Sequence, residues 1–149
     1  MEYLEELLKY PDRGLLEHEI IIAVNSRILQ KQKGGYCENQ RMTSFNKHEI
    51  WYCDPNEIYS KMQTIIDHFN QKCAYQKQVL EALAEFAISF LAIHPFGNGN
   101  GRTIKFLMWY VLKSFQRIKT FHLLDYNTWC KIVYHKSYDF LLKWLQNVL

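Results

Sequence analysis

The sequence predicts an all-α fold, a helical bundle interrupted by one β-hairpin. Apolar residues recur with spacings of three and four along most of the 149 residues, which is the period of an amphipathic helix. This period is lost between Tyr36 and Cys53 alone. Apolar residues make up 48% of the chain and charged residues 22%, which is ordinary for a globular protein. With no repeats and no linker-like segment, residues 1–149 are expected to form a single domain.

Two amphipathic helices are expected before the hairpin. Pro11 should stop the first, and the pair Gly34-Gly35 should end the second. Their apolar positions are Leu4, Leu7 and Leu8 in the first and Leu16, Ile20, Val24 and Ile28 in the second.

The hairpin is the one strand candidate in the chain. Residues 36–53 are rich in β-branched and aromatic residues, and the polar centre of Phe45-Asn46-Lys47-His48 would allow a turn.

The next helix should start at Asp54, with Pro55 in its first turn and Glu57 completing a capping box. Its apolar positions are Ile58, Met62, Ile65 and Phe69. The helix after it carries Val79, Leu83, Phe86, Phe90 and Leu91 on one face. The same spacing brings His94 to the end of that face, and Pro95 stops the helix.

The strongly apolar helix expected from Thr103 onward includes the run 106–112, which indicates burial on nearly all sides. We expect it to be the central helix. Two more helices should follow, from about Asp125 and from about Ser137. The apolar positions of the last are Leu141, Leu142, Leu145 and Val148.

The charge balance and the cysteine spacing exclude some classes of function. The chain has 18 Lys plus Arg against 15 Asp plus Glu, without a dense basic stripe, so nucleic-acid binding is not expected. Its four cysteines form no C-x-x-C pair, which favours a reduced environment. The acidic start lacks an apolar signal core, and the longest apolar run is too short to span a bilayer. We therefore expect a cytoplasmic protein without a membrane partner.

The segment most indicative of chemistry runs from His94 to Arg102. Gly97-Asn98-Gly99-Asn100-Gly101 joins a helix end to a helix start, where backbone amides and the helix dipole favour an anion. Arg102 adds a forked cation suited to phosphate. His94 can act as a general base near neutral pH. A base beside a phosphate cradle indicates transfer of a phosphorus-centred group.

A structural interpretation of the same residues stays open. Asn-Gly pairs make tight turns, and His94 taken alone could be a capped core histidine. The combination of base, glycines and arginine within nine positions favours function over structure.

This segment resembles the signature of the Fic family, H-x-F-x-[D/E]-G-N-G-R-x-x-R. The matching residues are His94, Phe96, Gly99, Asn100, Gly101 and Arg102. The order of elements is also similar to that family, with an upstream hairpin called the flap and a motif loop between two core helices.

The resemblance implies a protein adenylyltransferase. His94 would deprotonate a Ser, Thr or Tyr hydroxyl of a target protein, which attacks the α-phosphorus of ATP and expels pyrophosphate. Phe96 would hold the loop in the core. The implied nucleotide-binding residues are Gly97, Asn98, Gly99, Asn100, Gly101, Arg102 and Lys105.

Two positions depart from the family pattern. Asn98 stands where the family has an acidic residue that helps to hold Mg²⁺, so it is expected to be a weak metal ligand. Lys105 replaces the second arginine and lacks the bidentate fork. A phosphorylating branch of the family has lysine at the position of Gly101, which therefore favours adenylylation here. Transfer of UMP, phosphate or phosphocholine remains open, as does a non-catalytic nucleotide-binding or interaction protein.

The resemblance also implies how partners bind. In the family a target segment pairs with the flap edge, so residues 40–52, and Arg41, Met42 and Thr43 among them, are candidates for target docking. A merely structural hairpin is the alternative. The family's inhibitory pattern [S/T]-x-x-x-E-[G/N] is not found in this sequence. A separate antitoxin-like partner, an unrestrained enzyme and a diverged site are the options left. A toxin and a secreted effector acting in a host cytoplasm both fit.

Overall fold

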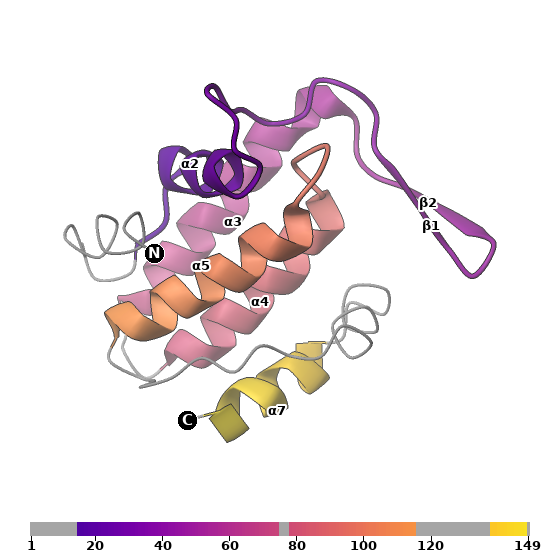
Figure 1. Cartoon of the computed structure of the whole chain (residues 1–149). Helices are drawn as coiled ribbons and strands as arrows, with labels where there is room; N and C mark the ends of the chain where they lie inside the picture. Colours follow the sequence, from indigo (N-terminus) through magenta and orange to yellow (C-terminus); the bar gives the residue numbers. More distant parts are fainter. Residues whose placement is uncertain (1–14, 75–77, 116–137, 149) are drawn as a thin grey trace.

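A computed structural model describes residues 15–74, 78–115 and 138–148 of the chain. In these residues the chain forms five α-helices, one short 3-10 helix and one two-stranded antiparallel sheet (Figure 1). The expected helical fold with a single hairpin is confirmed. The helices expected around residues 4–8 and from about Asp125 lie outside the described residues.

Helix α4 (Val79–Ile93) packs against α3 (Ile58–Cys73), α5 (Asn100–Ser114) and α7 (Tyr138–Val148), and α2 (His18–Ile28) packs across α5 and α3 (Figure 1). The sequence predicts the 103–112 helix as the central one; among the described residues it is α4 that packs against three other helices. Its small residues Ala82, Ala84 and Ala87 are fully buried and let other helices approach closely. The run in α5 is nevertheless buried over most of its surface.

The core is formed mainly by the facing sides of α3, α4 and α5. All five apolar positions expected on α4 are buried. On α3 the expected Ile58, Met62 and Phe69 are buried, whereas the expected Ile65 is only partly buried and its neighbour Ile66 lies in the core. Among the described residues, no helix has both the length and the apolar character that crossing a membrane requires.

Two helix boundaries differ from those expected. Helix α2 ends at Ile28, well before the glycine pair, because Gln30 adopts a left-handed conformation with φ of 55°. Lys31 N then donates to Ser26 O at 2.8 Å, which closes a Schellman-type end. Helix α5 begins at Asn100 rather than Thr103, because Gly99 takes the N-cap position with φ of 78°.

The hairpin consists of β1 (Met42–Phe45) and β2 (His48–Trp51), which pair from Met42 opposite Trp51 to Phe45 opposite His48. Asn46 and Lys47 both have positive φ, of 49° and 66°, as a two-residue type I′ turn requires. The hairpin projects away from the bundle beside the loop between α4 and α5 (Figure 1).

The 3-10 helix η1 (Pro55–Glu57) leads from the hairpin into α3. Its cap is the expected Asp54, whose carboxylate accepts a hydrogen bond from Asn56 N at 2.9 Å. The capping box expected with Glu57 does not form in this way, because Glu57 N donates to the backbone Asp54 O, and the α-helix itself begins at Ile58.

Candidate functional site

His94 forms the C-cap of α4. Its backbone is left-handed, with φ of 55° and ψ of 63°, and its N–H donates to Phe90 O at 2.9 Å. A residue with a Cβ adopts this conformation at a cost of about 1–3 kcal/mol, so surrounding contacts have to hold it. The side chain is half-buried and its Nδ1 is buried. Nε2 is therefore the ring nitrogen that can meet a substrate.

The backbone of His94 is held by a buried arginine. Arg41 is 4% exposed, and its Nε donates to His94 O at 2.7 Å. Its Nη2 donates to Ile93 O at 2.9 Å, and its Nη1 to Cys53 O at 2.9 Å. A cation at a helix C-terminus is stabilised by the carbonyl groups that end the helix. Arg41 thus joins both ends of the hairpin segment to the end of α4.

The ring of His94 is covered by Tyr52. The two rings are parallel within 8° and their centroids are 4.0 Å apart. The Tyr52 hydroxyl donates to Thr43 Oγ1 at 2.9 Å, and Tyr52 N donates to Arg41 O at 3.2 Å. The side chain that stacks on the histidine is therefore itself fixed to the opposite strand of the flap.

The motif loop is closed by Asn100. Its amide accepts from Phe96 N at 3.0 Å and donates to Phe96 O at 2.8 Å, and the residue is buried. Phe96 is buried between Phe90 and Tyr36, as its role in holding the loop requires. The Asn100 side chain is occupied in the turn, so its backbone N–H is the part that can face an anion.

A second asparagine, from α2, fixes the other side of the loop. The buried Asn25 donates through Nδ2 to Asn98 O at 3.0 Å and to Thr103 Oγ1 at 3.1 Å. Gly99 lies against this residue: a Cβ at Gly99 would come within 3.2 Å of Asn25 Nδ2 and would have to adopt a positive φ. The positive φ favours glycine here, and the contact with Asn25 leaves little room for a larger residue.

The first turn of α5 follows directly. The backbone N–H groups of Asn100, Gly101 and Arg102 belong to the helix start, where no intrahelical acceptor is available to them. The Arg102 side chain is exposed and Lys105, one turn later, is partly exposed. The structure thus brings His94, the amides of the first turn and Arg102 to one end of the bundle. This arrangement can bind a polyphosphate next to a base.

Gly97 and Asn98 lie on the exposed side of the loop. The Asn98 side chain accepts a hydrogen bond from Gly99 N at 2.8 Å through Oδ1. Its oxygen is thus neutral and already engaged. In the part of the chain that the structure describes, no group of three or more His, Cys, Asp or Glu could hold a metal ion.

The three flap residues expected to dock a target have different surroundings. Arg41 is buried against α4, so its side chain holds the flap and is not exposed to a partner. Met42 is 43% exposed, while Thr43 accepts the bond from Tyr52. The backbone of the strands, rather than the Arg41 side chain, is what remains for docking.

Behind the loop lies a polar cluster that the sequence analysis missed. His18 is 2.6 Å from the Tyr36 hydroxyl through Nδ1 and 2.8 Å from Gln63 Oε1 through Nε2. Burial and nearby negative charge raise the pKa of Tyr36 above its usual range, so the phenol stays neutral. Its ring supports Phe96 at 5.4 Å between centroids.

Asn25 and Tyr52 were also missed. Asn25 lies four positions after Ile21, on the apolar face of a helix. A polar residue at such a position indicates a polar contact within the core. Tyr52 gave no sequence signal, because its partner His94 is brought to it by the fold.

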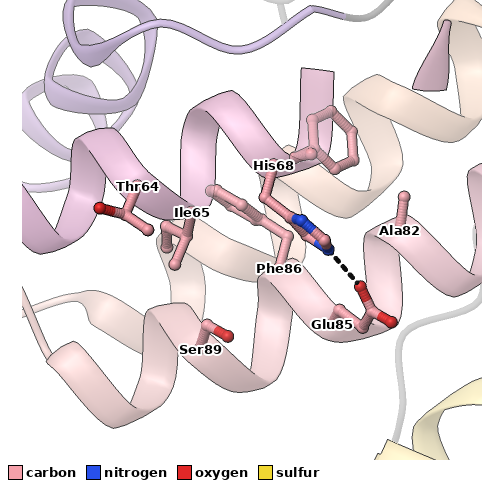
Figure 2. Close-up of a pocket in the computed structure, with 8 residues that line it drawn as sticks. Thr64, Ile65, His68, Ala82, Glu85, Phe86 and Ser89 are labelled. Atoms are coloured by element: carbon pink, nitrogen blue, oxygen red, sulfur yellow. Dashed lines mark hydrogen bonds and ion pairs between the residues drawn. The ribbon is translucent and has the colours of Figure 1, made fainter. Parts of the chain in front are cut away.

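A shallow hollow lies between α3 and α4, away from the motif loop (Figure 2). At its edge His68 Nε2 is 2.9 Å from Glu85 Oε2, and Lys72 Nζ is 2.7 Å from Glu85 Oε1. The residues lining it are Thr64, Ile65, His68, Phe69, Ala82, Glu85, Phe86 and Ser89. None belongs to the site around His94.

Comparisons with known proteins identify the family and a similar fold. The sequence model of the Fic/DOC family matches residues 15–112, more than half of the chain. A Fic domain containing signaling protein from Bacteroides thetaiotaomicron VPI-5482 has a similar fold, with a TM-score of 0.80 and 18% sequence identity. The alignment covers 97% of this chain and 64% of that one, so this chain spans slightly less than two thirds of that protein. A search of curated proteins gives no match.

Proposed function

We propose that this chain, which belongs to the Fic/DOC family, transfers an adenylyl group from ATP to a Ser, Thr or Tyr hydroxyl of a target protein. The observation that supports the proposal is that His94, held at the end of α4, is joined by the short loop 95–99 to the amide-lined start of α5. Nε2 of His94 takes the proton of the target hydroxyl. The hydroxyl oxygen then forms a bond to the α-phosphorus, and the bond to the β-phosphate oxygen breaks, releasing pyrophosphate.

The nucleotide is held by the loop and the residues that follow it. The N–H groups of Asn100 and Gly101 and the helix dipole stabilise the phosphate charge, and Arg102 binds the outer phosphates through its planar fork. Lys105 adds a positive charge one turn further along. Gly97 and Gly99 belong to the same loop, and Gly99 gives it the positive φ of 78° that the turn into α5 requires.

Magnesium enters as part of the substrate, Mg²⁺·ATP. The neutral, already bonded oxygen of Asn98 is a poor ligand for a hard cation, whereas the phosphates and water satisfy most of the coordination that magnesium prefers. Magnesium bound to ATP neutralises phosphate charge during the transfer.

The target protein docks on the flap by strand addition. The exposed Met42 and the backbone of β1 and β2 offer the contacts, within reach of the residues that surround His94. An antitoxin-like protein is a second possible partner, since it could supply the inhibitory glutamate that this sequence lacks.

The test is labelling of target proteins. Incubation of the protein with tagged ATP, magnesium and a cell lysate should label discrete proteins, and His94→Ala should abolish the label. Exchange of an exposed histidine outside the site, His68→Ala, should leave it intact. Label of equal strength with His94→Ala would overturn the assignment of the base.

A second candidate function is a nucleotide-binding module without transfer activity, favoured by the neutral Asn98. This candidate predicts a different result from that of an active transferase. ATP would bind in calorimetry, but no protein would be labelled at any magnesium or manganese concentration.

A further inference from the structure

His94 has an unfavourable backbone conformation at a position where its ring must be accurately placed. The left-handed φ of 55° is unusual for a residue with a Cβ. At this residue the chain leaves α4, and the ring stacks on Tyr52 of the flap. A conformation that costs free energy persists when neighbouring groups hold it, and two such groups come from the flap.

Arg41 holds the main chain of His94. Its Nε and Nη2 donate to the consecutive carbonyls of His94 and Ile93, at 2.7 and 2.9 Å. These two donors lie on one edge of a rigid plane, so they fix the relative direction of two carbonyls at the point where the helix ends. A lysine has a single ammonium group and cannot reproduce this geometry.

Tyr52 holds the ring. A parallel contact at 4.0 Å restricts rotation of the imidazole about its side-chain bonds. Tyr52 in turn is held by Arg41 O and by Gln40, whose Nε2 donates to Tyr52 O at 2.8 Å. Ring and backbone of the histidine are thus both fixed by one hairpin segment, residues 40–53.

We propose that Arg41 and Tyr52 are positioning residues for the base, so that the flap sets the geometry of His94 in addition to docking the target. The expected effect on kcat rests on the proposed function. The fixed position of the His94 ring rests on the observed contacts alone. Displacement of the ring by about 1 Å is enough to cost roughly 100-fold in rate. The loss should fall on kcat, because neither residue takes part in the phosphate-binding loop.

The structural arm of the test is NMR on the protein with labelled histidine. An aromatic ring stacked on another shifts its protons upfield, and His94→Ala identifies the signal of His94. Tyr52→Ala should abolish the upfield shift and Tyr52→Phe should keep it. Tyr59 stacks on His18 at 4.1 Å and 8°, so Tyr59→Ala is a matched control that should move the His18 signal and not that of His94.

The kinetic arm uses Tyr52→Ala and Arg41→Lys. Both should lower kcat roughly 100-fold with KM for ATP unchanged, while Tyr52→Phe keeps most of the activity and Tyr59→Ala all of it. An unchanged His94 signal in both Tyr52→Ala and Arg41→Lys would overturn the inference. If neither the parent protein nor any variant transfers AMP, the proposed function fails. The NMR experiment still decides whether Arg41 and Tyr52 position His94.

Discussion

At the scale of single residues, three amides have distinct tasks around one loop. Asn100 closes the turn at Phe96, Asn25 ties the loop to α2, and Asn98 bonds to the next backbone N–H. The family signature predicted the first and third positions, though it assigned both to the nucleotide. The two buried amides, Asn25 and Asn100, fix the geometry of the loop before any ligand binds.

Replacement of Asn98 by aspartate tests the metal argument. Asn98→Asp supplies a charged oxygen ligand, so the apparent affinity for Mg²⁺ in the transfer reaction should rise roughly tenfold, equivalent to about 1.4 kcal/mol. Titration of magnesium at saturating ATP measures it. Asn98→Ala is the control and should keep the parent's dependence. Identical magnesium curves for Asn98→Asp and the parent would contradict the argument.

Removal of the Asn100 amide should weaken the whole domain. Asn100→Ala leaves the buried N–H and C=O of Phe96 without their bonds, at a cost of about 1–3 kcal/mol for each group left unsatisfied. Chemical denaturation measures the loss. Asn56→Ala, at an exposed position, should change the free energy of unfolding little. Equal stability of the two variants would show that the amide does not hold the loop.

At the scale of elements, the hairpin and α4 form one functional unit. Arg41 bonds at the same time to Ile93 O at the end of α4 and to Cys53 O at the far end of the flap segment. An element that projects from the bundle is in this way fixed at its base. Under the proposed function, target docking on its strands would therefore act on the position of His94.

The pair of helices α3 and α4 carries a pH-dependent contact at the rim of the hollow in Figure 2. Burial alone would raise the pKa of Glu85, but the hydrogen bonds from Lys72 and His68 hold it below its usual value. A carboxyl group with a lowered pKa in the folded state stabilises the protein above its unfolded pKa of about 4.3. This stabilisation is lost as the pH falls through the folded value.

Glu85→Gln should accordingly lower the free energy of unfolding by roughly 0.2–1 kcal/mol at neutral pH, as is usual for exposed ion pairs. The difference from the parent should shrink as the pH is lowered past about 4.3. Denaturation at several pH values measures it, with Glu38→Gln as an exposed control. A difference that stays constant down to acid pH would refute the ionic origin.

Helix positions in the sequence could be predicted well where apolar spacing decides them, as on α4, whose five expected residues are all buried. Helix faces and ends could not be predicted where polar residues determine them. Asn25 makes a polar contact on the inner face of α2, and the left-handed Gln30 ends the helix. Hydrophobic periodicity indicates neither. The contact between Tyr52 and His94 joins residues far apart in the chain, so the fold itself is needed to find it.

At the scale of the whole molecule, the site depends on the packing of α5 against α4 and α2, because the loop joins α4 to α5 and Asn25 comes from α2. Leu107 lies fully buried on α5. Leu107→Ala should lower the free energy of unfolding by about 2–5 kcal/mol through the cavity it leaves. Leu15→Ala, at a partly exposed position, should cost much less. Thermal unfolding of both variants measures the difference, and equal losses would contradict the packing described.

The proposed function requires that the transferred group is AMP and that His94 removes the proton of the target hydroxyl. One measurement tests both: target labelling in parallel with ATP carrying the isotope in the α- or the γ-phosphate, with the parent protein and His94→Ala. We predict label on the target from α-labelled ATP, none from γ-labelled ATP, and none from either with His94→Ala. Label from the γ-phosphate would show phosphorylation in place of adenylylation, and α-label that survives in His94→Ala would contradict the role of the histidine.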